Sequence, residues 1–273
     1  MTKRFFFKSA ACAVIALASL GAYAQDALSR VKAAGVLKVG TETAFAPFDF
    51  IKDGEHVGMN MDLFAEIAKE MGVKLEWVLL PWEGVFPGLE AGKFDVVAGP
   101  ATITKERMAR FRFSPPIAEA TVALLKRKSE TSITKPADIS GKAVGAGKAT
   151  AQLAQLKAFG DTLPGKVDAR EYPGYNEAYA DLAAGRVVAV ANSITNITFV
   201  AQQRPDFEVV KPAFGAKSYF GFIWRKDADS DKLVAALNAA ILKIKADGRL
   251  ASIQKKWFGD SFDTPNEITQ ANF

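Results

Sequence analysis

The sequence has one cysteine and one histidine, and each scarcity excludes a class of protein. Cys12 lies inside an apolar run near the N-terminus, so the chain beyond it offers no thiol for a disulfide or for nucleophilic catalysis. His56 follows the turn signal Asp53-Gly54, and we expect it to be exposed to solvent. Because one remote histidine supports neither a metal centre nor a catalytic triad, we expect no cofactor.

Long apolar runs are also scarce, and the one near the N-terminus has the features of a secretory signal peptide. The basic residues are Lys3, Arg4 and Lys8. They precede the apolar stretch Ser9–Gly21, which is too short to span a membrane comfortably. Ala22-Tyr23-Ala24 then gives a small-x-small cleavage pattern. We expect cleavage after Ala24 and a soluble, periplasmic mature protein that depends on its core for stability.

An excess of charge of one sign is missing as well. Cleavage after Ala24 removes only basic side chains and lowers the formal net charge from +5 to +2. No block of lysine and arginine is interleaved with aromatic residues, so we expect no nucleic-acid partner.

Strand and helix patterns alternate along the chain, which predicts an α/β fold with mainly parallel sheets flanked by helices. The first unit has strand patterns at residues 37–40, 73–80 and 94–98, with helices from Asp62 and Val85. The second has strand patterns at 142–145, 169–172, 187–191 and 207–210, with helices from Thr150, Tyr175 and Ser193.

Two extended segments, residues 121–125 and 219–224, connect these units. We therefore expect two lobes joined by two crossover hinge strands. Residues 25–123 and 219–273 would form lobe 1, and residues 124–218 would form lobe 2.

The stretch from Gly99 to Arg107 has the composition of an anion site. A turn of small residues follows a buried strand and leads to Thr104, which we expect to cap a helix that carries Arg107. Backbone N–H groups and the hydroxyls of Thr102 and Thr104 would converge there. The guanidinium matches a carboxylate with two parallel hydrogen bonds. On this segment alone, a capped helix with a solvated arginine is the alternative.

Ligands of open α/β sheets bind beyond the carboxyl ends of the strands, so the residues just past each strand form a predicted site. The positions are Glu42, Phe45, Trp82, Ala101–Arg107, Lys148–Ala151 and Asn192–Thr195. Two aromatics, an arginine and two helix N-termini suit a small carboxylate that has some apolar surface. Core packing is the alternative role for both aromatics, and solvation is the alternative for Glu42.

Together these segments resemble the extracellular solute-binding proteins of family 3, the periplasmic amino-acid-binding proteins of ABC importers. The resemblance covers essentially the whole mature chain and rests on the order and spacing of short motifs. They are Val39-Gly40-Thr41 with Pro47-Phe48, Val57-Gly58 with Asp62-Leu63, Gly84 with Pro87 and Leu89, Thr102-Ile103-Thr104 with Glu106-Arg107, Phe113-Ser114-Pro115, Ala184-Gly185-Arg186, Tyr219-Phe220-Gly221 and Lys256-Trp257-Phe258-Gly259.

The resemblance implies a type II periplasmic-binding-protein fold and a role for each site residue. Arg107, with the N–H of Thr102, would bind the ligand α-carboxylate, and the Thr102 hydroxyl and the Pro100 carbonyl would accept from the α-ammonium. The remaining roles fall to residues that would enclose the ligand: Phe45 and Trp82 around its side chain, Glu42 opposite a polar or basic group, and Thr150 and Ala151 from lobe 2.

One departure from the family concerns the ammonium. Ser193, preceded by Asn192, stands where the family usually has an aspartate, and Val188 replaces an acidic residue in the preceding strand. Losing that negative charge removes a hydrogen bond worth about 1.5–3 kcal/mol. Either Glu42 supplies the counter-charge, or the ligand is not an ordinary α-amino acid.

We therefore expect a monomeric periplasmic receptor and not an enzyme. The receptor would capture a small carboxylate ligand, which we expect to be an amino acid, and deliver it to an ABC transporter permease. A receptor for another carboxylate is one alternative. A cyclohexadienyl dehydratase is another, because such enzymes share this family, with Glu42 as the acid and Lys148 as a second candidate. A receptor-kinase sensor domain is disfavoured, because no transmembrane helix precedes the end of the sequence at Phe273.

Overall fold

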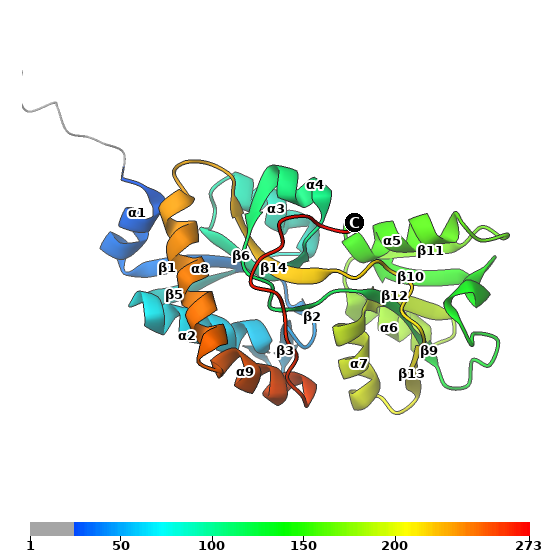
Figure 1. Cartoon of the computed structure of the whole chain (residues 1–273). Coiled ribbons are helices and arrows are strands. Elements are labelled where there is room, and N and C mark those ends of the chain that lie inside the picture. Colours follow the sequence, from blue (N-terminus) through cyan, green and yellow to red (C-terminus); the bar gives the residue numbers. More distant parts are fainter. Residues whose placement is uncertain (1–24) are drawn as a thin grey trace, which may run out of the picture.

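The computed structural model describes residues 25–273 and shows two α/β bodies side by side, lobe 1 and lobe 2 (Figure 1). The predicted signal peptide lies outside the described residues. Lobe 1 contains a six-stranded sheet in the order β5-β1-β6-β14-β7, with β8 paired to β14, and a small sheet in the order β2-β3-β4. Lobe 2 contains a five-stranded sheet in the order β11-β10-β12-β9-β13.

The elements have the following bounds. The strands of lobe 1 are β1 (Val36–Thr41), β2 (Ala44–Phe45), β3 (Asp49–Lys52), β4 (Glu55–Val57), β5 (Lys74–Leu79), β6 (Val96–Thr102), β7 (Phe111–Phe113), β8 (Ala118–Glu119) and β14 (Tyr219–Arg225). Those of lobe 2 are β9 (Val122–Arg127), β10 (Ala143–Gly147), β11 (Asp168–Tyr172), β12 (Ala189–Ser193) and β13 (Phe207–Val210). The α-helices are α1 (Ala27–Ala34), α2 (Met59–Met71), α3 (Trp82–Glu90), α4 (Lys105–Arg110), α5 (Ala151–Gly160), α6 (Tyr175–Ala183), α7 (Ile194–Gln203), α8 (Asp231–Ala246) and α9 (Arg249–Phe258).

The two-lobed α/β architecture is as predicted, and each sheet is mixed. In lobe 1, β1 pairs in parallel with β5 and β6, and in lobe 2, β10 pairs in parallel with β11 and β12. The crossing strands run the other way, since β14 is antiparallel to β6 and β9 is antiparallel to β12. The carboxyl ends of both parallel sets therefore remain available for a site between the lobes.

The two connections between the lobes lie side by side. The N–H of Ala120 donates to the carbonyl of Ser218 at 2.8 Å, and the N–H of Ser218 faces the Thr121 hydroxyl at 3.4 Å. Two neighbouring segments that cross together can bend together, which is the geometry a hinge requires.

The structure corrects several predicted boundaries. The predicted turn of small residues is strand, because Ala101 and Thr102 extend β6 by pairing with Gly221 and Phe220 of β14. Helices α2 and α3 begin three residues earlier than the apolar pattern indicates, and β12 runs two residues further, through Ser193. An apolar pattern marks only the buried face of an element, so it does not report the first turn of a helix.

His56 is not exposed, contrary to expectation. Its side chain is 12% exposed, its Nε2 lies 3.1 Å from Oδ1 of Asp49, and its ring meets the Trp77 ring edge-on at 5.3 Å. The β3–β4 hairpin brings His56 onto β5, and that contact between distant segments has no local signal in the sequence.

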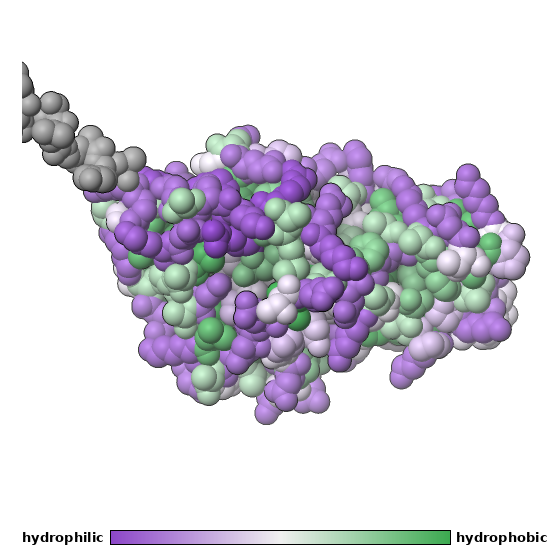
Figure 2. All heavy atoms as spheres, turned by 45° about the horizontal axis from the view of Figure 1, so that its top comes forward, coloured by the Kyte–Doolittle hydropathy of each residue, from purple (hydrophilic) through white to green (hydrophobic). Residues whose placement is uncertain are grey.

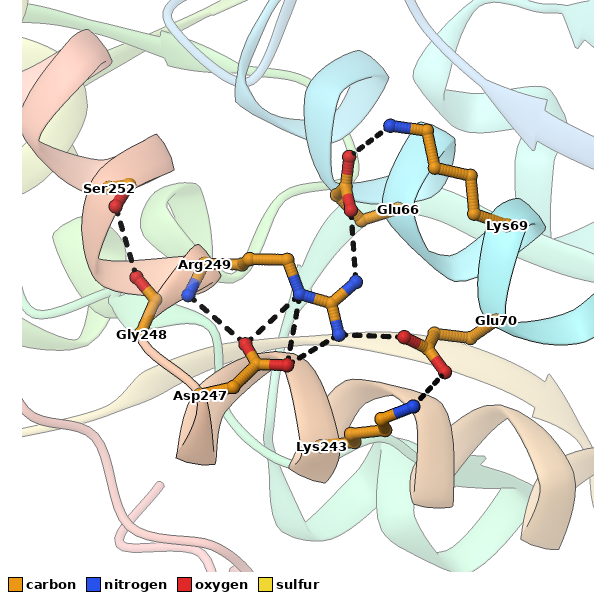
Figure 3. Close-up of polar contacts among 8 residues, drawn as sticks. All are labelled: Glu66, Lys69, Glu70, Lys243, Asp247, Gly248, Arg249 and Ser252. Carbon is orange, nitrogen blue, oxygen red and sulfur yellow. Dashed lines mark hydrogen bonds and ion pairs between the residues drawn. The ribbon is translucent and has the colours of Figure 1, made fainter.

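A network of ion pairs ties α2 to the C-terminal helices of lobe 1 (Figure 3). The guanidinium of Arg249 lies 2.9 Å from Glu66, 2.7 Å from Glu70 and 2.6 Å from Asp247. These hydrogen bonds raise the pKa of Arg249 above its ordinary value and lower the pKa of Asp247. A shared cation among three carboxylates orders more side chains than an isolated surface pair does.

On the face seen in Figure 2, hydrophilic side chains are spread over both lobes, with smaller hydrophobic areas between them. Within residues 25–273, no helix combines the length and the apolar character needed to cross a bilayer.

Candidate ligand-binding site

Most of the predicted contacts meet around one small cavity between the lobes. Its wall consists of Glu42, Phe45, Trp82, Pro100, Thr102, Arg107, Thr150 and Gln152. The space is about 10 Å³, which is the room that one water molecule needs. The lobes are therefore closed on each other here, and a ligand larger than water requires them to stand further apart.

Arg107 is the cation of this cavity, and two elements hold it. Thr104 caps α4, as predicted, because its hydroxyl accepts from the N–H of Arg107 at 3.2 Å. The guanidinium donates to the Thr102 carbonyl at 3.1 Å and lies 5.7 Å from the centre of the Trp82 ring and 4.9 Å from that of Phe86. Burial lowers the pKa of Arg107 to about 10. Among the described residues it forms no ion pair, so a half-buried positive charge lacks a counter-ion.

Glu42 is the acid of this cavity and comes directly after β1. It is 8% exposed, and burial together with the nearby carboxyl of Asp49 raises the pKa of Glu42 to about 8. Asp49 lies behind it, fully buried, and its oxygens contact His56 and accept from the side-chain amide of Asn60. Glu42 therefore stays protonated at neutral pH in this closed arrangement unless a positive group stands beside it.

Aromatic side chains from lobe 1 form the remaining walls. Trp82 is the first residue of α3, directly after Pro81, whose fixed φ prepares the helix start. Phe45 lies on β2 and contacts Tyr175 of lobe 2, with ring centroids 5.7 Å apart. Both are buried between the lobes, where they offer apolar surface to a ligand side chain.

Lobe 2 contributes the start of α5. Thr150 caps this helix, as predicted, because its hydroxyl accepts from the N–H of Leu153 at 3.1 Å and donates to the Gly147 carbonyl at 2.7 Å. Gln152, in the first turn, was not predicted. The one feature of the sequence that could have indicated Gln152 is its position. It is the second residue after the helix cap Thr150, so its side chain can reach the space that the cap faces.

The structure places four predicted contacts away from this cavity. Ala101 is fully buried in β6, and Ala151 faces an adjoining cleft of about 710 Å³ between α3, α4 and α5. Asn192 donates to the Tyr179 hydroxyl at 2.9 Å and faces a separate pocket beside Phe45. Ser193 is fully buried in β12, and its hydroxyl donates to the Ala120 carbonyl at 3.2 Å and accepts from Gln152 at 2.7 Å.

Three polar contacts hold the lobes together beside the cavity. The indole N–H of Trp82 donates to the Ala149 carbonyl at 3.2 Å, and the side-chain amide of Asn196 donates to the Ala46 carbonyl at 2.7 Å. Lys148 pairs with Glu83 at 2.7 Å, and both side chains are more than half exposed, so this pair is weak. Lys148 thus acts between the lobes and is not in the cavity wall.

Comparison with known proteins identifies the family of this chain. The family model of the bacterial extracellular solute-binding proteins, family 3, matches residues 37–260. The chain is 31% identical to the L-cystine-binding protein TcyJ of Escherichia coli over 91% of this chain and 92% of TcyJ. It is 32% identical to the L-arginine-binding protein of Pseudomonas aeruginosa over 90% of this chain and 97% of that protein.

A solved structure shows the same fold. An ancestral arginine-binding protein bound to arginine superimposes with a TM-score of 0.75 at 35% identity, over 82% of this chain and 99% of that one. The breadth of these matches covers both lobes and the cavity between them. The chain belongs to the bacterial extracellular solute-binding proteins of family 3.

Proposed function

We propose that this protein is a periplasmic receptor that binds one amino acid between its lobes and delivers it to the membrane permease of an ABC importer. The observation that carries the proposal is a pair of ionisable groups that have no ion-pair partner among the described residues and line one small cavity. Arg107 supplies a half-buried positive charge and Glu42 a buried acid. A zwitterion satisfies both at once, because its carboxylate pairs with the guanidinium and its ammonium with the carboxylate of Glu42.

The other residues of the wall have distinct roles in this proposal. Phe45 and Trp82 cover the ligand side chain, and the hydroxyl of Thr102 and the carbonyl of Pro100 accept from its ammonium. Lobe 2 adds Thr150 and the start of α5, whose helix dipole favours the carboxylate when the lobes close.

Similarity to the relatives supports the wider assignment. TcyJ and the Pseudomonas protein are named for cystine and arginine, and both are binding proteins. We also propose that the receptor is a monomer. We further propose export by a signal peptide at residues 1–24, and lobe boundaries at residues 123/124, two residues inside β9, and 218/219.

A thermal-shift screen of purified protein tests the proposal with matched pairs of ligands. Each L-amino acid is compared with its α-keto acid, which keeps the carboxylate and lacks the ammonium. We expect at least one amino acid to raise the melting temperature by mass action, and its keto acid to raise it far less. Equal shifts from a keto acid would show that Glu42 does not bind an ammonium, and would favour a receptor for another carboxylate.

An enzyme remains the second candidate because of one observation. With its pKa at about 8, Glu42 is a protonated acid at neutral pH in the wall of the cavity between the lobes, as general acid catalysis requires. A prephenate or arogenate turnover assay separates the two functions, and we expect no turnover above the rate of the Glu42→Gln variant.

A further inference from the structure

We propose that the cavity selects amino acids with no net charge on the side chain over basic and acidic ones. This inference rests on the proposed function and specifies its ligand class. It follows from counting the charged groups that a bound ligand meets when the lobes close.

The wall of the cavity contains one cation and one acid among the described residues, Arg107 and Glu42. The other wall residues carry no charge, and each is either apolar or polar. The next acid, Asp49, does not line the cavity and is fully buried behind Glu42. Its oxygens contact His56 and Asn60, so each is already engaged within lobe 1.

The polar side chain of lobe 2 that lines the cavity beside Ser193 is the amide of Gln152, which is 3% exposed. Its Nε2 donates to the Ser193 hydroxyl at 2.7 Å, and that hydroxyl donates onward to the Ala120 carbonyl at 3.2 Å. Ser193 can therefore only accept from Gln152, which fixes the orientation of the amide. The Nε2 atom points to Ser193 and the Oε1 atom is left for the cavity. Lobe 2 thus offers a ligand a neutral acceptor where a carboxylate would add a second negative charge.

The charges balance for one class of ligand. A zwitterion with a neutral side chain pairs its carboxylate with Arg107 and its ammonium with Glu42, and the closed site holds no unpaired charge. Within this wall, a basic side chain adds a second cation with no second acid to pair with it, and an acidic side chain adds a second anion with no second cation. An unpaired charge is costly in a space closed to water, so both classes bind more weakly.

Isothermal titration of the wild-type protein with near-isosteric pairs tests the inference. L-citrulline matches L-arginine in shape without its charge, and L-glutamine matches L-glutamate. We expect the neutral member of each pair to bind at least about tenfold more tightly, since the charged member brings an unpaired charge into the closed site. Tighter binding of L-arginine or L-glutamate overturns the inference and leaves the proposed function intact. If neither these four nor any other amino acid binds, the proposed function fails and the inference fails with it.

A pair of variants at one position provides a second readout. Ser193→Asp places a carboxylate beside Gln152, and Ser193→Asn changes the size of the side chain in the same way without charge. We expect Ser193→Asp to move the preference toward L-arginine relative to L-citrulline by about tenfold, and Ser193→Asn to keep the wild-type ranking. An equal change in both variants would mean that packing, not charge, sets the selectivity. The melting temperature of each variant verifies that it is folded, and the wild-type titrations decide the question if one is not.

Discussion

Closure of the ligand-free protein should depend on pH through Glu42. Its pKa rises from an ordinary value of 4.5 to about 8 when the lobes are closed, and we expect it to return toward 4.5 when opening admits water. Below pH 4.5 the carboxyl is protonated in both forms, so closing costs nothing extra. Between pH 4.5 and 8, Glu42 must take up a proton when the lobes close. The free-energy cost of closing therefore rises by about 1.36 kcal/mol per pH unit. At pH 7 the penalty is therefore about 3 kcal/mol, and above pH 8 it levels off.

Fluorescence energy transfer between the lobes measures this penalty. Residues 25–273 contain no cysteine, so Lys93→Cys on lobe 1 and Lys166→Cys on lobe 2, both exposed, label two unique sites. The closed fraction without ligand should fall as the pH rises from 4.5 to 8, and Glu42→Gln should remove most of that dependence. A saturating amino acid should keep the protein closed across the range, because its ammonium pairs with the ionised carboxylate. Identical pH profiles for the wild type and Glu42→Gln would refute the role given to this carboxyl.

Three further predictions concern other charged groups. Arg107→Ala should abolish the ligand-induced rise in melting temperature, with at least about a hundredfold loss of affinity in titration, whereas Arg110→Ala on the same helix should bind normally. Lys148→Ala should weaken ligand binding by no more than about fivefold, because its ion pair between the lobes is exposed, and a greater loss would contradict that view. Arg249→Ala should lower the melting temperature more than Arg186→Ala does. Removing Arg249 leaves three carboxylates without their shared cation, whereas Arg186 pairs with one. Equal effects in thermal denaturation would show that the network adds nothing.

The site illustrates which contacts a linear pattern can predict. Thr104 and Thr150 cap their helices as expected, because capping depends on residues three positions apart in the chain. Glu42, Phe45 and Trp82 reach the cavity because they follow strand or loop ends that face the other lobe. Ser193 also follows that rule, yet its hydroxyl is engaged by Gln152 and Ala120, residues far away in the sequence.

The sequence by itself determined the alternation of strands and helices, the two crossings between the lobes and the capped helix that carries Arg107. These features depend on periodicity and on neighbours in the chain, so the local sequence is enough to predict them. Only the tertiary structure decided that His56 is buried against Asp49, that β6 extends to Thr102, and that Gln152 replaces Ser193 in the cavity wall. Each of these outcomes depends on which distant segment lies opposite, and on how much water is excluded when the two lobes meet.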